Sequence, residues 1–228
     1  EAQFYMLSVS VLLITFALAV IYYPGETTLS GNVTRPLALI PVALYGLYIF
    51  IQYQDTSDYE SDNDTEGIAV VRQWGFLLAG LAVILVAVEN LVHSVGVIGA
   101  AFGADEFLMG VTILAAATSL PDTLVSVRAA KDNRGVTSLA NVLGSNTFDL
   151  LVAIPLGVLI VGTWTVDFAM AVPMFAVLTA ATILLFTTLR TDLALSTLES
   201  YALLVAYISF VAWVVAETAG YATGILPA

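Results

Sequence analysis

Long apolar runs separated by short polar stretches dominate this chain. A helix needs about 20 residues to cross the roughly 30 Å hydrocarbon core of a bilayer, and seven runs are long enough. They cover residues 5–22, 37–53, 74–97, 107–129, 138–162, 168–188 and 194–216. Residues 77–86 show none of the strict apolar and polar alternation that a transmembrane barrel strand requires. The pattern therefore predicts an all-α polytopic membrane protein with about seven transmembrane helices.

The longest polar stretch, residues 54–73, carries six carboxylates and few apolar residues, so we expect a mobile acidic loop. It divides the chain into two helices over residues 1–53 and five helices over residues 74–228. Residues 62–67 match the first half of a calcium-binding loop, with carboxylates at positions 1, 3 and 5 and a glycine at position 6. Position 12 is Gln73, where a bidentate glutamate would close the cage, so a solvated acidic loop is favoured over a calcium loop.

Composition narrows the class of protein further. The chain is 60% hydrophobic with a mean hydropathy of +0.96, which excludes an ordinary soluble domain. Its net charge of -12 argues against a nucleic-acid partner, because phosphate backbones attract basic surfaces. A surface rich in acids and poor in lysine also suits a high-salt cytoplasm, where salt screens self-repulsion, and so favours a halophilic source. Because the chain has no cysteine, any bound metal must rely mainly on oxygen ligands.

The basic residues sort to one side of the predicted seven-helix topology. Five of the six lie on that side and only Arg35 lies on the other, so the positive-inside rule places the five in the cytoplasm. The acidic loop is then cytoplasmic and residue 228 is external. We expect an integral, multi-pass protein of the cell membrane, surrounded by lipid. The five cytoplasmic basic residues are Arg72, Arg128, Lys131, Arg134 and Arg190.

Two aspartates, Asp122 and Asp149, lie inside membrane-length apolar runs. An ionised Asp at the centre of a membrane helix costs about 2.5–3.5 kcal/mol even on insertion scales, so each aspartate needs a compensating partner. A cation is the most direct partner. Ion handling is therefore the leading functional hypothesis, with proton handling as the alternative.

The first aspartate ends a proline-centred motif, Thr-Ser-Leu-Pro-Asp. Pro121 has no backbone N–H and clashes with the preceding turn, so it frees the carbonyl of Ala117 and predicts a kink. Loose backbone at membrane depth survives where it is buried in protein or lines a watery cavity. There, backbone carbonyls and the hydroxyls of Thr118 and Ser119 can coordinate a cation beside Asp122.

The second aspartate ends a polar stripe. Asn141, Ser145 and Asp149 are spaced four residues apart and so share one helical face, with Asn146 beside it. The short connector over residues 131–137 makes the two motif helices antiparallel neighbours, which can bring both polar faces together near the bilayer midplane. Oxygen ligands that include two carboxylates suit calcium, sodium or potassium rather than zinc or copper. Taken singly, the Ser, Thr and Asn side chains fit helix–helix hydrogen bonding equally well.

Together, the two motifs resemble the second alpha-repeat of the calcium/cation antiporter superfamily, to which the sodium/calcium exchangers belong. The resemblance rests on Thr-Ser-Leu-Pro-Asp and Gly-Ser-Asn-Thr-Phe-Asp and covers about residues 110–160. It implies a ten-helix fold of two inverted repeats, with two of the present helices kinked or broken. Residues 74–228 would be the second five-helix half, and residues 1–53 the end of the first half.

The resemblance also implies a ligand for each ion, residue by residue. Calcium coordination falls to Asp122 with Thr118. Asn146 matches the motif in either a coordinating or a structural role. The implied sodium sites draw on the Ala115 carbonyl, Ser119, Ser145 and Asp149.

Two positions depart from the commoner family pattern. Ala117 stands where many members have glycine, and Asp122 stands where many have glutamate, so the carboxylate is one methylene shorter and the cavity is larger. An aspartate at this position, with the later Phe-Asp pair, is similar to the potassium-dependent sodium/calcium exchangers, so potassium co-transport is an open alternative. The second motif with Glu and His that is usual in the proton/calcium branch does not occur in this sequence.

One acidic repeat motif occurs in the 228 residues, whereas the family builds its site from two. The apolar runs at residues 5–22 and 37–53 contain neither a Ser-Pro-acid nor a Gly-Ser-Asn sequence. We therefore expect a missing N-terminal repeat, supplied as a separate chain or lost by cleavage. An antiparallel homodimer is the other way to complete the site.

The function expected from the sequence is secondary antiport of calcium against sodium, with no enzymatic activity and no prosthetic group. Proton/calcium antiport is one alternative. An intramembrane aspartyl protease is another, although the Tyr-Asp and Gly-x-Gly-Asp motifs of such enzymes do not occur at Asp122 or Asp149. A scaffold without transport leaves both aspartates unexplained. Glu89 and His93, four residues apart, fit a local hydrogen bond better than a proton relay.

Overall fold

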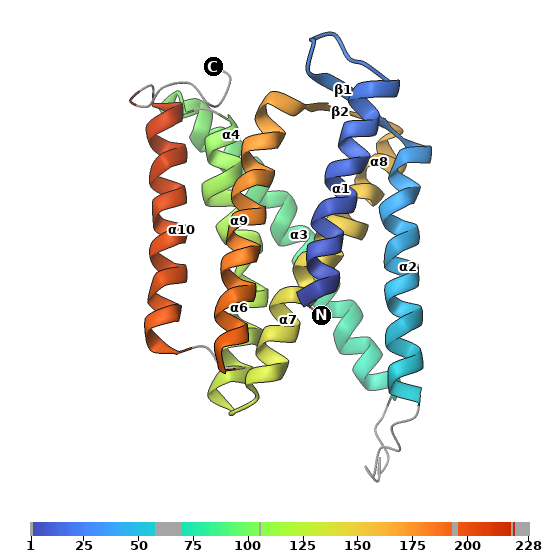
Figure 1. Cartoon of the computed structure of the whole chain (residues 1–228), viewed down its shortest axis with the longest axis vertical. Helices are drawn as coiled ribbons and strands as arrows, with labels where there is room; N and C mark the ends of the chain where they lie inside the picture. Colours follow the sequence, from blue (N-terminus) through green and yellow to red (C-terminus); the bar gives the residue numbers. More distant parts are fainter. Residues whose placement is uncertain (1, 58–69, 105, 193–195, 220, 222–228) are drawn as a thin grey trace. The chain divides into compact units, whose positions relative to one another are not determined.

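A computed structural model describes residues 2–57, 70–104, 106–192, 196–219 and 221 (Figure 1). Among these residues, six helices are long and apolar enough to cross a membrane, and a seventh span follows if two helices that meet at a bend count as one. The spans coincide with the seven apolar runs, so the prediction of an all-α polytopic membrane protein is confirmed. The chain forms two compact units, which we call the larger unit (residues 1–53 and 122–228) and the smaller unit (residues 54–121).

Helices make up most of the described residues of each unit, and two of the membrane runs are divided into shorter pieces. The described helices of the smaller unit are α3 (Val70–Phe102), α4 (Glu106–Met109), the π-helical turn η1 (Gly110–Leu114) and α5 (Ala115–Thr118). The larger unit takes in α1 (Ala2–Tyr22), α2 (Arg35–Ser57), nearly all of α6 (Leu120–Lys131), α7 (Gly135–Phe148), the π-helical turn η2 (Asp149–Ala153), α8 (Ile154–Val161), α9 (Phe168–Asp192) and α10 (Thr197–Thr218).

Local sequence explains several helix ends. Ser196 and Glu199 form a capping box before α10: the Ser196 hydroxyl accepts from the Glu199 N–H, and the Glu199 carboxylate accepts from the Ser196 N–H at 2.8 Å. α8 ends at Gly162, whose φ of +104° lies in a region that favours glycine. Gly103, with φ +62°, ends α3 in the same way. Polar N-capping residues and glycines after the last turn are therefore the residues that end helices between apolar runs.

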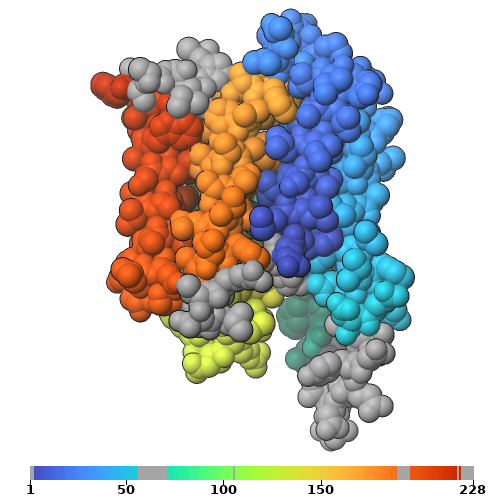
Figure 2. Space-filling model, in the orientation of Figure 1, coloured from blue at the N-terminus to red at the C-terminus, as the bar shows by residue number. Residues whose placement is uncertain are grey.

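The core of the larger unit is built around α1. Leu12 and Phe16 are buried, and they belong to a cluster that also includes Val158 of α8. One and two turns earlier, Val9 and Tyr5 pack with Leu143 of α7. α1 also contacts α9, and the two helices lie side by side in both views, with α10 on the far side of α9 (Figures 1 and 2). A single helix therefore holds α7, α8 and α9 together.

A two-stranded antiparallel ribbon adds to the helices and was not anticipated from the sequence. β1 (Ser30–Thr34) follows α1 and pairs with β2 (Thr163–Asp167), which follows α8, in the register Ser30 to Asp167 and Thr34 to Thr163. The pairing joins segments about 130 residues apart, so no local pattern could reveal it. It ties the connector after α1 to the connector after α8.

Two contacts reinforce this ribbon. Gly31 lies so close to the end of α1 that a Cβ atom there would be 2.4 Å from the backbone nitrogen of Val20, so no side chain fits without movement. Arg35, the one basic residue assigned to the external side, donates from Nε to the carbonyl of Leu159 at 3.0 Å. This carbonyl belongs to the last turn of α8, where a cation also complements the helix dipole. The end of α8 is therefore anchored to α2 as well as to the ribbon.

The smaller unit packs α3 against α4 and η1. Val95 of α3 and Met109 of α4 are buried, and Gly99 allows close approach, since a Cβ there would lie 3.1 Å from the Met109 side chain. Glu89 and His93 lie on α3, and both are exposed. Most of the acidic loop expected at residues 54–73, with its calcium-loop pattern at residues 62–67, lies outside the described residues.

The buried position of α1 yields a stability prediction. Leu12 is 2% exposed and Leu7, on the same helix, is 45% exposed. Leu12→Ala should lower the melting temperature of the detergent-solubilised protein by roughly 5–15 °C, because it removes packing between helices and leaves a cavity. Leu7→Ala is the matched control and should shift it by less than about 2 °C. Equal shifts for the two variants would contradict the assigned core.

Candidate cation-binding site

The first motif lies where a membrane helix breaks. The path through α4, η1 and α5 ends at Thr118, Ser119 follows with φ -82° and ψ -7°, and α6 begins at Leu120. Pro121 is in the first turn of α6, where its lack of an N–H is tolerated, and the carbonyl of Ala117 accepts from the N–H of Ser119 instead. The two helices are bent at this break, which confirms the predicted kink.

The hydroxyl of Thr118 is held by its own helix. The Oγ1 atom of Thr118 donates to the carbonyls of Leu114 at 3.0 Å and Ala115 at 3.1 Å. The backbone N–H of Ser119 donates to the same Ala115 carbonyl at 3.1 Å. A hydroxyl that donates its one hydrogen keeps its lone pairs, so the oxygen of Thr118 remains able to coordinate a cation.

The second motif runs into a π-helical turn that the sequence analysis missed. η2 begins at Asp149, whose carbonyl accepts from the N–H of Ile154, five residues on. The other motif carries a similar turn, η1, directly before Ala115. Such turns occur often at functional sites, since they leave backbone groups less regularly paired. The signal available in the sequence was Pro155, which has no N–H for the carbonyl of Leu151.

The two motif helices of the hairpin are antiparallel neighbours, as expected. Asn141 of α7 donates from Nδ2 to the hydroxyl of Ser126 at 3.0 Å and to the backbone carbonyl of Asp122 at 3.3 Å, both on α6. Ser126 is buried and Asn141 is partly buried. The sequence analysis placed Asn141 on the polar stripe but did not identify Ser126, although Ser126 lies one turn after Asp122 on the same face.

The hairpin brings the two aspartates within reach of each other's charge. The charge of Asp122 acts on the carboxylate of Asp149, and the two side chains come from neighbouring helices. Asp122 is partly buried, whereas Asp149 is exposed. On the same stretch of α7, Ser145 donates to the carbonyl of Val142 at 3.2 Å, and the Nδ2 atom of Asn146 donates to it at 2.9 Å. The oxygens of both side chains therefore remain available as acceptors.

The seven residues implied as ligands are divided between the two units. Four of them, Asp122, Ser145, Asn146 and Asp149, belong to the larger unit, where they lie on one helical hairpin and the π turn that continues it. The other three belong to the smaller unit and precede Asp122 closely along the chain; they are Ala115, Thr118 and Ser119. Whether all seven hold ions together stays a prediction.

The chemistry of the hairpin favours an exchangeable hard cation. Among the described residues, no group of three or more His, Cys, Asp or Glu side chains is placed to hold a metal. A site here would combine two carboxylates with neutral hydroxyl, amide and carbonyl oxygens, which are ligands for calcium and alkali cations. Zinc and copper sites instead use imidazole or thiolate ligands.

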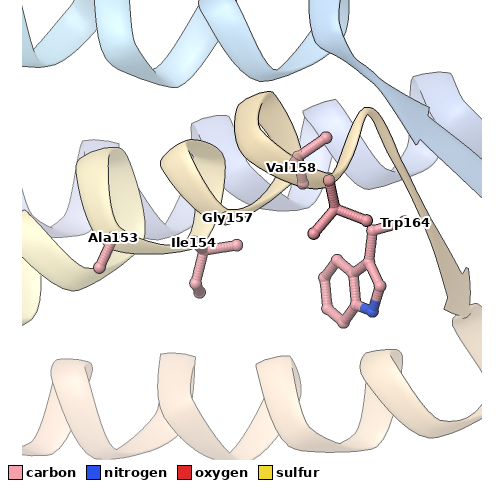
Figure 3. A pocket seen from close by; sticks show the side chains of 6 residues that line it. Ala153, Ile154, Gly157, Val158 and Trp164 are labelled. Atoms are coloured by element: carbon pink, nitrogen blue, oxygen red, sulfur yellow. The ribbon is translucent and has the colours of Figure 1, made fainter. Parts of the chain in front are cut away.

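A cavity farther along the same run is apolar and unsuited to ions. It has a volume of about 320 Å³ and lies beside α8, where Trp164 of β2 stands next to Val158 and Ile154 (Figure 3). Trp164 also meets the ring of Phe16 edge-on at 5.9 Å. The residues that line the cavity carry no charge; they are Ala153, Ile154, Gly157, Val158, Val161 and Trp164.

Most of the chain is similar to known proteins. The family described as "Sodium/calcium exchanger protein" matches residues 72–216, which include both motifs. An uncharacterised membrane protein of Methanocaldococcus jannaschii is 35% identical over 117 residues, which are 49% of this chain and 39% of the relative. The putative antiporter CaxA of Alkalimonas amylolytica is 33% identical over 138 residues, 59% of this chain and 43% of the relative.

A human protein named sodium/potassium/calcium exchanger 5 is 43% identical over 61 residues, 27% of this chain and 12% of the relative. In each case the match spans less than half of the relative's length. No solved structure matches the chain. These relatives are named as exchangers or an antiporter where a function is given, which agrees with the expectation that the chain is not an enzyme.

The like charges of the hairpin yield a second prediction. In chelator and at low sodium, Asp149→Asn should raise the melting temperature by about 2–4 °C, because it removes repulsion from Asp122; screening at the exposed Asp149 keeps the effect this small. Added calcium should then stabilise the variant less than the wild type. The control is Asp132→Asn, which removes only an exposed ion pair with Arg128. A variant less stable than wild type in chelator would argue against repulsion between the two aspartates.

Proposed function

This chain belongs to the sodium/calcium exchanger family, within the calcium/cation antiporter superfamily, and from that premise we propose that it is part of a secondary antiporter that moves calcium against sodium across a membrane. One observation carries the proposal. α6 and α7 pair as antiparallel helices, and Asp122 and Asp149 lie within reach of each other's charge beside broken or π-helical backbone. Two uncompensated acids at membrane depth are best explained by a cation that both of them bind.

The proposed ligands follow the two motifs. Calcium binds Asp122 with the oxygen of Thr118, on either side of the helix break. Sodium ions use a set of ligands with more neutral oxygens, because a monovalent ion needs less negative charge around it than calcium does. That set consists of the Ala115 carbonyl, Ser119, Ser145 and Asp149, with Asn146 as a neutral oxygen ligand or a support.

Competition within one site would couple the two fluxes. Calcium at Asp122 and sodium at Asp149 would lie within reach of each other's charge, so binding of one cation weakens binding of the other. An empty site with two negative charges is disfavoured in a low-dielectric interior, where repulsion is strong. The empty transporter therefore resists the change in access, and ions cross only in exchange.

Potassium co-transport is a variant of the proposed function. Several relatives are named sodium/potassium/calcium exchangers, including human exchangers 3, 4 and 5, with 39–43% identity over 61–66 residues. The shorter carboxylate of Asp122 leaves room for an additional or larger cation than glutamate would. We propose potassium co-transport as the variant of the function to test first, and proton coupling as the second.

A second acidic helix pair is proposed to complete the site. The chain supplies one alpha-repeat at residues 110–160, and exchangers of this kind use two repeats around one cavity. We assign residues 74–228 to a second half and residues 1–53 to the end of a first half. The remaining ligands would come from a first repeat in the same or another polypeptide, or from an antiparallel second copy.

We also propose an orientation in the cell membrane. The hairpin between α6 and α7 carries Arg128, Lys131 and Arg134, all exposed, and the positive-inside rule assigns it to the cytoplasm with residues 54–73. The ribbon of β1 and β2 and residue 228 would then be external.

A flux measurement tests the function. Asp122→Asn should reduce sodium-dependent uptake of radiolabelled calcium into vesicles by roughly 100-fold or more, because it removes the charge that binds calcium. Imposing sodium, potassium and proton gradients in turn identifies the coupling ion. The control is Asp132→Asn, which should transport like the wild type. Near-normal uptake by Asp122→Asn would refute the assigned role.

Cysteine labelling tests the orientation, and the chain has no native cysteine to interfere. Val136→Cys, 86% exposed after the basic hairpin, should react with an impermeant maleimide only from the cytoplasmic side. Thr28→Cys, exposed before β1, should react only from outside. The opposite pattern would invert the proposed topology.

A further inference from the structure

Asn141 links α6 and α7 directly beside the proposed ion site. Its Nδ2 atom donates to the hydroxyl of Ser126 at 3.0 Å and to the backbone carbonyl of Asp122 at 3.3 Å. A backbone carbonyl can only accept, so the NH₂ end of the amide must face α6. Ser126 is 7% exposed, so this contact is shielded from competing solvent. The end of Asn141 that faces α6 is therefore a donor, which cannot coordinate a cation.

The position of Asn141 relates the two acids to each other. One of its acceptors is the main chain of Asp122, and Asp149 lies two turns, or about 12 Å, farther along the helix that carries Asn141. The connection therefore fixes the residue that bears one carboxylate against the helix that bears the other. Ser145 lies one turn beyond Asn141, between Asn141 and Asp149 along the chain.

The hydrogen bonds from Asn141 hold α6 and α7 together. Helices in a membrane gain no hydrophobic attraction for each other, so packing and hydrogen bonds must hold them together. The repulsion between Asp122 and Asp149 pushes α6 and α7 apart whenever no cation lies between them. The π turn η2, which starts at Asp149, makes the backbone after α7 less regular. A contact that fixes α7 to α6 before this turn therefore helps to position Asp149.

We propose that Asn141 and Ser126 form a positioning pair that sets the separation of Asp122 and Asp149, and through it the affinity for calcium, without touching the ion. The inference rests on the proposed function and adds two residues to the site. It distinguishes Asn141 from Asn90 of α3, whose Nδ2 donates at 2.7 Å to the carbonyl of Val86 on its own helix, a bond that joins no second helix.

The first readout is ion affinity. Asn141→Ala and Ser126→Ala should each weaken calcium binding and raise the KM for calcium by roughly 10- to 100-fold, with kcat changed by less than about threefold. The double variant should be no worse than Asn141→Ala alone, because that variant already removes the contact with Ser126. Ser126→Thr, which keeps the hydroxyl, should retain most of the affinity. Asn90→Ala is the matched control and should behave like the wild type.

The second readout does not depend on ions. Spin labels at Leu124→Cys on α6 and Val142→Cys on α7, both exposed positions, report the distance between the helices. Adding Asn141→Ala should broaden and lengthen that distance in chelator, and adding Asn90→Ala should leave it unchanged. If the wild type binds no calcium, the proposed function fails, and the spin-label distance still decides whether Asn141 positions the helices.

Three results would overturn the inference. An unchanged distance with weakened calcium binding would make Asn141 a ligand rather than a positioning residue. A changed distance with unchanged calcium affinity would separate the contact from the site. Additive losses in the double variant would show that Asn141 and Ser126 act independently.

Discussion

The structure depends on the repulsion between two carboxylates at membrane depth. Asp122 and Asp149 come from neighbouring helical segments, and the charge of Asp122 acts on the carboxylate of Asp149. This arrangement destabilises the protein on its own and is stable only with a cation or a strong framework. The broken helix at Ser119, the π turn at Asp149 and the hydroxyl and amide oxygens around them all supply partial charge for a cation. A site made in this way has the oxygen ligands that we propose for an exchangeable hard cation.

The framework around the hairpin resists that repulsion. α1 packs against α7, the π turn and α9, so the second motif is held from one side along most of its length. The far end of the same run is fixed by the ribbon of β1 and β2 and by the bond from Arg35 to the carbonyl of Leu159. Near its start, Asn141 ties it to α6. The run from α7 to α8 is thus held at both ends, and its irregular middle, η2, lies between the fixed points.

Local signals in the sequence account for the helices, the break and the hairpin. Seven apolar runs predicted the spans, Pro121 predicted the break, and the short connector predicted the antiparallel hairpin, since each depends on residues close together in the chain. The ribbon could not be predicted because its strands are about 130 residues apart and short. The pairing of Asn141 with Ser126 depends on how two helices rotate against each other, which a single-helix pattern leaves open. The π turn at Asp149 had one signal, Pro155, whose effect on the preceding turns is visible only in the folded chain.

The central claim is that calcium and sodium compete within one site that contains both acids. Calorimetric titration of the purified wild-type protein with calcium, at a series of fixed sodium concentrations, tests it most directly. Saturable calcium binding whose apparent affinity falls steadily as sodium rises, with unchanged stoichiometry, is the result expected of one shared site. Calcium binding that is indifferent to sodium, or that does not occur, would contradict the account.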